Sequence, residues 1–172
     1  MTNLEIKVVA QNLEEIKEKA IIKIDAKNIA TLFQIDTYFL IGSKRLKLRE
    51  EKDTKYLVYY VRNNKEKSKL SKYHIIAVPK KLVSFVKNIL SFIFGVKVIV
   101  NKKRDLFMYK NTRIHFDDVK NLGTYVELET VFNNNQKENE LVLEHNFVIT
   151  SLGLDTLEKI PNSYSDLMIN KK

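Results

Sequence analysis

The sequence contains no cysteine, which excludes disulfide bonds, thiolate catalysis and zinc sites built from cysteine ligands. This absence fits an intracellular setting, and we predict that the protein is cytoplasmic. The first twenty residues carry acidic side chains and no apolar core segment, so we predict that they are not a secretory signal.

Long hydrophobic runs are also missing. Only "KKLVSFVKNILSFIFGVKVIV", residues 80–100, raises the question of a membrane span, but Lys87, Asn88 and Lys97 interrupt it and Gly95 divides it. Because a charge within a lipid-facing span is costly, we predict a helix up to Phe94 followed by a strand, and no membrane partner.

Acidic residues are fewer than basic ones. The chain has 30 Lys and Arg against 21 Asp and Glu, which gives a formal charge of +9 and a pI near 9.5. Such an excess attracts anionic partners, and nucleic acid, acidic lipid and polyphosphate compounds all qualify. With 172 residues, of which 44% are hydrophobic, we predict one domain, residues 1–172, with a substantial core.

Hydrophobic periodicity predicts an alternating order of strands and helices. "NLEIKVVA" at 3–10 alternates with a period of two, and Asn12 is typical of an N-cap for a helix over 13–25. Further strands are predicted over 31–40, 44–50, 55–62 and 69–78, then a helix over 80–94, strands over 96–109 and within 113–130, and a helical tail broken at Gly153 and Pro161.

Several predicted strands carry an apolar face and a cationic face. In "RLKLR" three cations alternate with Leu46 and Leu48. The solvated face of an antiparallel sheet is the common explanation of such a pattern. Here, however, the cations would repel one another across neighbouring strands: Arg45, Lys47, Arg49, Lys102, Arg104 and Arg113. Acidic residues are expected on this face only near both ends of the chain: Glu5, Asp117, Glu127 and Glu129.

A triphosphate with a divalent cation would relieve this repulsion. Lys and Arg bind phosphate oxygens directly, and Arg often forms two bonds at once. Mg²⁺ or Mn²⁺ prefers oxygen ligands and is usually held by one or two carboxylates plus substrate phosphate. If the strands close into a barrel, these side chains would line a polar interior.

The ordered set of motifs resembles the CYTH superfamily, the triphosphate tunnel metalloenzymes, and most of all its class IV adenylyl cyclase branch. The segments that carry the resemblance are "NLEIK", "QIDTYF", "RLKLRE", "YLVYYVR", "KLSKYH", "VNKKR", "RIHFDDVKNLGTYVELE" and "SLGLDTLEKIPNSYSDLM". The resemblance implies an α+β fold in which a closed antiparallel eight-stranded β-barrel, the triphosphate tunnel, is flanked by helices.

The resemblance also implies roles for individual residues. The family motif E-x-E-x-K falls on Asn3, Glu5 and Lys7, and Asn3 at its first acidic position leaves open whether one or two metal ions bind. The implied ligands of Mg²⁺ or Mn²⁺ are Glu5, Asp117, Glu127 and Glu129. The implied phosphate-binding residues are Lys7, Arg45, Lys47, Arg49, Arg62, Lys102, Arg104 and Arg113, of which Lys7, Arg49 and Arg113 are assigned a catalytic role.

The implied reaction is either conversion of ATP to cyclic AMP and pyrophosphate or hydrolysis of an inorganic or organic triphosphate. The alternative is a non-catalytic module that binds nucleic acid or polyphosphate, although Glu127 and Glu129 would weaken nucleic-acid binding. A homodimer is left open.

Other polar and aromatic residues have structural explanations. His74 and His145 are predicted to be structural, and His115 is the exception because it lies between Arg113 and Asp117 in the alternation. The aromatic residues of the predicted sheet, including those of "DTYF" at 36–39, are expected to pack, although those near Arg62 could stack on bases.

Overall fold

The computed structural model describes residues 3–42, 44–61, 72–132 and 137–171. Within these ranges the chain forms eight strands and four α-helices, which confirms the α+β class. The strands are β1 (Asn3–Val9), β2 (Lys27–Phe39), β3 (Arg45–Glu50), β4 (Lys55–Val61), β5 (Lys72–Ala77), β6 (Val96–Tyr109), β7 (Thr112–Val119) and β8 (Gly123–Val131). The helices are α1 (Leu13–Ile24), α2 (Val83–Phe94), α3 (Glu138–Leu152) and α4 (Tyr164–Asn170).

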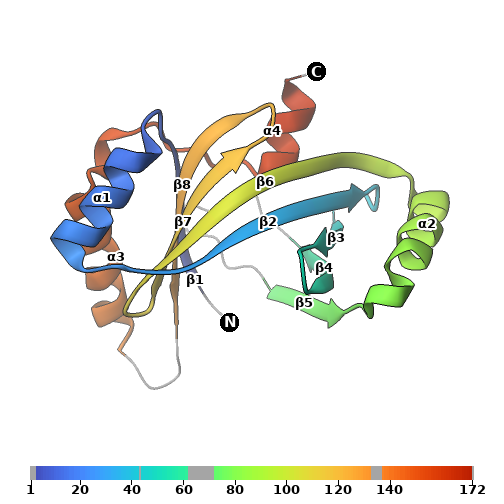
Figure 1. Ribbon diagram of the computed structural model, residues 1–172, viewed down its shortest axis with the longest axis horizontal. Helices are drawn as coiled ribbons and strands as arrows, with labels where there is room; N and C mark the ends of the chain where they lie inside the picture. The colour runs from blue at the N-terminus through green and yellow to red at the C-terminus, as the bar shows by residue number, and fades with distance from the viewer. Residues whose placement is uncertain (1–2, 43, 62–71, 133–136, 172) are drawn as a thin grey trace.

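All eight strands belong to one antiparallel sheet with the order β1-β8-β7-β6-β2-β3-β4-β5. The predicted number and direction of the strands are therefore confirmed. The predicted closure is not, because β1 and β5 are the two ends of the order and each pairs with one strand in the described part of the chain. The long strands β2 and β6 run between the two ends of the molecule, as Figure 1 shows.

Helices α1 and α3 pack together on the outer face of the sheet at one end of the molecule (Figure 1). Their buried side chains meet alternate residues of β1, β7 and β8 in the largest apolar core, which includes Val8, Phe116, Leu128 and Val148. The predicted N-cap of α1 is confirmed, because the Asn12 side chain accepts a hydrogen bond from the backbone N–H of Glu15.

Helix α2 lies at the opposite end (Figure 1). It packs through Val83 and Leu90 on Phe39, Leu46 and Leu48 of β2 and β3. Its predicted range is confirmed, with its first turn, Lys80–Leu82, in the 3₁₀ form. Among the helices of the described ranges, none is both long and apolar enough to cross a membrane.

The short helix α4 packs on the other face of the sheet. Its N-cap, Ser163, forms a capping box with Asp166. Tyr164 packs with Val100, Val119 and Tyr125. The register places Val119 opposite Lys102 and Tyr125 opposite Asp117, so α4 covers one end of the sheet face that carries the predicted charges.

Candidate active site

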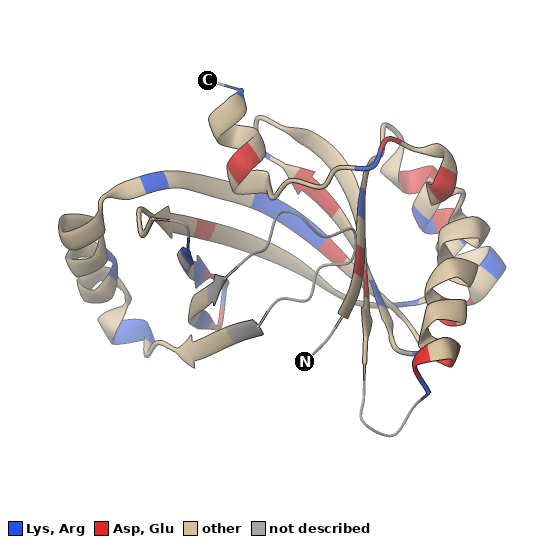
Figure 2. Ribbon diagram, turned by 180° about the vertical axis from the view of Figure 1, so that it is seen from behind, with Lys and Arg blue, Asp and Glu red and all other residues tan. Residues whose placement is uncertain are grey.

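Strand register brings the predicted site residues onto one face. Residues that oppose one another on antiparallel strands point to the same side of the sheet. Two rows of residues on this face run across β7, β8 and β1. One row consists of Arg113, Glu129 and Glu5, and the next of His115, Glu127 and Lys7. We call this side of the sheet the polar face; Figure 2 shows charges of both signs on its strands.

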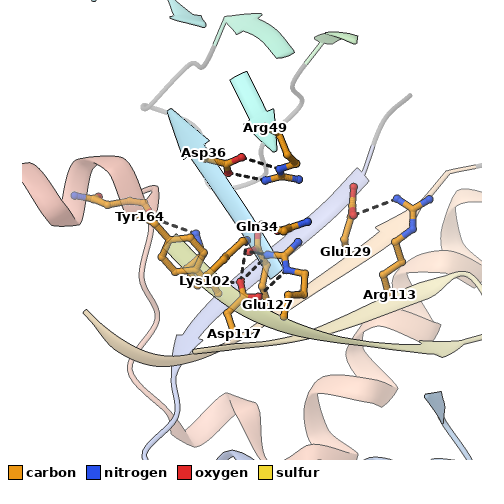
Figure 3. Close-up of polar contacts among 12 residues, drawn as sticks. Gln34, Asp36, Arg49, Lys102, Arg113, Asp117, Glu127, Glu129 and Tyr164 are labelled. Atoms are coloured by element: carbon orange, nitrogen blue, oxygen red, sulfur yellow. Dashed lines mark hydrogen bonds and ion pairs between the residues drawn. The ribbon is translucent and has the colours of Figure 1, made fainter. Parts of the chain in front are cut away.

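Asp117 on β7 holds the first pair of cations. Arg104 donates two hydrogen bonds to its carboxylate, from Nε and Nη2, both at 2.6 Å, and a third at 3.1 Å to Glu127. Lys102 Nζ lies 3.3 Å and the Tyr164 hydroxyl 2.8 Å from Asp117 Oδ2 (Figure 3). Burial alone would raise the pKa of Asp117, but Lys102 and Arg104 lower it well below its usual range, so the carboxylate is ionised.

Asp36 on β2 holds the second pair. Arg49 donates to both of its oxygens at 2.7 Å, and Lys47 Nζ lies 2.8 Å from Oδ2. The prediction that acids occur on this face only near the chain ends is therefore wrong. The missed signal was the period of two, since Gln34, Asp36 and Tyr38 point to the same side. The predicted packing of the aromatic residues in "DTYF" is confirmed, because Tyr38 and Phe39 are buried in apolar clusters.

The two lysines of these pairs have unusually low pKa values. Burial, followed by the charge of Arg104, lowers the pKa of Lys102 to about 7. Burial, followed by the charge of Arg49, lowers that of Lys47 to about 8. The predicted repulsion among cations is therefore present, and the carboxylates of Asp36 and Asp117 offset it only in part.

Glu127 lies beside the first pair of cations. Burial opposes its ionisation, but the charges of Lys7 and Arg104 lower its pKa to about 2. His115, its neighbour on β7, is buried, and its Nδ1 has no hydrogen-bond partner among the described residues. Burial and then the charge of Arg104 lower the pKa of His115 well below its usual value, so the ring is neutral.

Oxygen atoms gather where β1 meets β8. Glu129 accepts a hydrogen bond from the Asn3 amide. It accepts another, at 3.3 Å, from Arg113 Nη1 (Figure 3). Glu5 opposes Glu129 in register, and the buried Oδ1 of Asn3 has no hydrogen-bond partner in the described ranges. Two carboxylates and an amide oxygen suit Mg²⁺ or Mn²⁺ chemically. Within the same ranges, no three His, Asp or Glu side chains converge closely enough to hold a metal ion on their own.

Two further cations at the covered end of the polar face contact the C-terminal segment. Lys7 Nζ lies 4.1 Å from the ring centroid of Tyr164 and 3.3 Å from the carbonyl oxygen of Asn162. Arg45 donates to Ser165 Oγ at 3.1 Å and to Asp166 at 2.8 Å. Arg62, which was also predicted to bind phosphate, lies outside the described residues.

Comparison with solved structures shows the same fold in proteins of low identity. The PH1012 protein of Pyrococcus horikoshii OT3 has a TM-score of 0.76 at 23% identity, over 96% of this chain and 98% of that one. A candidate adenylate cyclase of Vibrio parahaemolyticus has a TM-score of 0.70 at 16% identity, over 98% of both chains. HpAC1 of Hippeastrum, a protein with a dominant triphosphatase activity, has a TM-score of 0.66 at 10% identity, over 99% and 96%.

A search among curated proteins finds no match to this sequence. The CYTH domain model, however, matches residues 1–164, which is nearly the whole chain. This match confirms the resemblance predicted from the ordered motifs, and the chain belongs to the CYTH domain family.

Proposed function

We propose that the protein is a divalent-metal-dependent enzyme that processes a triphosphate bound along the polar face. The observation that carries this proposal is the pair of buried carboxylates, Asp36 and Asp117, each of which holds one Arg and one Lys. The four strands involved, β7, β6, β2 and β3, are adjacent in the sheet. A row of oriented cations of this kind suits a short, highly charged phosphate chain.

Burial separates this proposal from nucleic-acid binding. Lys47, Lys102 and Arg104 are each less than a tenth exposed, so they lie too deep for an extended polymer backbone. Nucleic-acid binding relies on exposed cations that displace counterions, and carboxylates on the same face would oppose it. A compact triphosphate can enter between the side chains. The proposal includes the closed tunnel that the resemblance implies, with β1 and β5 completing the wall.

The metal would be held by Glu5 and Glu129, with the free oxygen of Asn3 as a third donor and phosphate oxygens supplying the rest. When bound, Mg²⁺ or Mn²⁺ supplies charge neutralisation and Lewis-acid polarisation of the phosphate oxygens. We assign Asp117 to holding Arg104, Lys102 and Tyr164, because its oxygens accept hydrogen bonds from all three. Glu127, which accepts a hydrogen bond from Arg104, remains a proposed metal ligand.

The protein's own groups would orient the phosphate chain and stabilise charge on its leaving group. Arg49 is fixed by two hydrogen bonds to Asp36, and Arg104 by two to Asp117 and one to Glu127, so their remaining N–H groups are held in position for phosphate oxygens. Arg113, held by Glu129, would contact phosphate next to the proposed metal ligands, and Lys7 would do so beside Glu127. Donors held in this way stabilise charge without reorganising during the reaction.

Two reactions are compatible with this site. One forms cyclic AMP and pyrophosphate from ATP, and the other hydrolyses a triphosphate. The structural relatives include a candidate adenylate cyclase and a protein with dominant triphosphatase activity, and their identities below 25% support the fold alone. The proposed activity is therefore triphosphate processing, and analysis of the products distinguishes cyclic AMP formation from hydrolysis.

The test is to offer ATP, tripolyphosphate and thiamine triphosphate with Mg²⁺ or Mn²⁺ and to identify cyclic AMP, pyrophosphate or orthophosphate among the products. We expect metal-dependent turnover of at least one substrate. Arg104→Gln should remove this turnover, whereas Lys23→Gln, at an exposed position on α1, should not change it. If no substrate is turned over, yet tripolyphosphate binds, the protein is a binding module.

A further inference from the structure

Helix α2 is apolar on two opposite sides. One side packs on the sheet through Val83 and Leu90. The other exposes a stripe of large apolar side chains at helical spacing: Phe85, Ile89, Phe92 and Ile93. Phe92 is 92% exposed and Phe85 63%. A contiguous exposed apolar surface of this kind marks an interaction site.

The charges around this stripe have one sign. From Pro79 to Arg104 the sequence contains no Asp or Glu, and Lys80, Lys81 and Lys97 flank the helix. Figure 2 shows Lys and Arg but no Asp or Glu on this segment.

Two neighbouring acids are already paired on the flank of this segment. Glu50 lies 2.7 Å from Lys87 Nζ, and Asp53 lies 3.3 Å from Lys80 Nζ. Lysines therefore still outnumber carboxylates around the stripe.

The position of α2 makes the stripe accessible to a flat partner. The helix forms one end of the longest axis of the molecule, whereas α1 and α3 form the other (Figure 1). The polar face, with α4 over one end of it, lies between them. A surface could therefore contact the stripe without covering the residues assigned to triphosphate binding.

We propose that α2 docks the protein onto the surface of an anionic lipid bilayer. The phenyl rings of Phe85 and Phe92 would enter the boundary between headgroups and acyl chains, while Lys81 and Lys97 contact lipid phosphates. This binding differs from a membrane span, for which no helix of the described ranges is long and apolar enough. It replaces the expectation of no membrane partner with contact at the membrane surface.

Charge favours this occupant over a second copy of the chain. If two α2 stripes paired in parallel, Lys81 would approach Lys81, and if they paired antiparallel, Lys81 would approach Lys97 of the partner. Because the segment contains no acid, either arrangement would bring like charges together. An anionic surface instead complements lysines at both ends of the stripe.

The test is flotation of the full chain with vesicles of phosphatidylglycerol and phosphatidylcholine, compared with vesicles of phosphatidylcholine alone. We expect binding to the anionic vesicles. Phe85→Ser combined with Phe92→Ser should weaken it on the order of tenfold or more, because the buried aromatic surface is lost. Lys81→Gln combined with Lys97→Gln should weaken it at low salt. The matched control is Ile22→Ser, which removes an apolar side chain that is 80% exposed on α1, at the other end of the molecule.

Circular dichroism verifies that each variant is folded. The proposal is overturned if the folded wild-type chain does not float with anionic vesicles, or if the double Phe variant floats equally well. Light scattering addresses the second-copy alternative. A dimer that the double Phe variant separates into monomers, together with no flotation of the wild type, would identify the partner as another copy of the chain.

Discussion

Asp36 accepts hydrogen bonds from Arg49 on both of its carboxylate oxygens, each at 2.7 Å, across neighbouring strands β2 and β3. The same carboxylate contacts Lys47, and both cations are largely buried. Asp36→Asn should therefore lower the free energy of unfolding by about 3 kcal/mol, because two buried cations lose their partner. Tripolyphosphate should recover part of this loss by supplying negative charge, which urea unfolding with and without the anion would measure.

Asp53→Asn is the matched control, because its pair with Lys80 is exposed, and it should change the free energy of unfolding by less than about 0.5 kcal/mol. If Asp36→Asn were as harmless as this control, the carboxylate would not be holding the two cations in place.

Arg104 makes the other two-bond contact, with Asp117. Arg104→Lys keeps the charge but loses the fork of N–H donors, and we expect kcat/KM for the preferred triphosphate to fall roughly 100-fold. Arg113→Lys, at a half-exposed position with one contact to Glu129, should cost less. Steady-state kinetics with identical metal concentrations compare the two. Equal losses in both variants would show that the two-bond geometry is not what matters.

The lowered pKa of Lys47 predicts how the binding of a polyanion depends on pH. Burial and Arg49 lower its pKa to about 8 from an ordinary value of 10.5. Lys102, whose pKa is about 7, titrates at a lower pH than Lys47. A bound polyanion favours the protonated form of both lysines, so binding of tripolyphosphate at pH 8 should take up protons, and affinity should fall as the pH rises above about 7. Calorimetry in buffers of different ionisation enthalpy measures the uptake. Lys47→Met should reduce it, and an unchanged uptake would assign the proton to another group.

The proposed role of Glu129 as a metal ligand predicts how turnover depends on the Mn²⁺ concentration. Glu129→Gln keeps the size of the side chain but removes the charge of a proposed metal ligand, so the Mn²⁺ concentration needed for half-maximal turnover should rise at least roughly tenfold. Titration of Mn²⁺ at saturating substrate measures this. Glu138→Gln, at an exposed position at the start of α3, is the control. The same Mn²⁺ requirement in both variants would remove Glu129 from the proposed ligands.

Local patterns predicted much of this structure. Alternation with a period of two identified the strands and the shared face of Arg49, Lys102 and Asp117, because side-chain direction along a strand follows from the backbone alone. The same rule applied to Asp36, but its aromatic neighbours Tyr38 and Phe39 suggested packing instead. Packing and site residues share one face of β2, because Tyr38 is buried in an apolar cluster on the side that carries Asp36.

Contacts between segments distant in the sequence were not predictable in this way. The contacts of Lys7 with Tyr164 and of Arg45 with Asp166 depend on where α4 packs, which no local pattern encodes. Closure of the sheet likewise depends on the twist accumulated over all eight strands. The alternation of side chains with a period of two does not determine that twist.

His145 on α3 predicts acid sensitivity of the fold. It is buried, with Nδ1 2.8 Å from Thr130 Oγ1, which in turn lies 2.8 Å from Thr112 Oγ1 on the neighbouring strand. Burial lowers its pKa to about 4 from 6.5, so the folded chain takes up this proton less readily than the unfolded chain does. Stability should therefore be intact above pH 6.5 and fall by about 3 kcal/mol as the pH drops to 4.

Other groups also titrate in this range, so the informative quantity is the difference between wild type and His145→Gln. The variant should lose less stability than the wild type between pH 7 and pH 4.5, as measured by urea unfolding at each pH. His74→Gln is the matched control, because His74 is exposed on β5 and should leave the wild-type profile unchanged. Parallel profiles for wild type and His145→Gln would mean that the acid sensitivity arises from the carboxylates of the polar face instead.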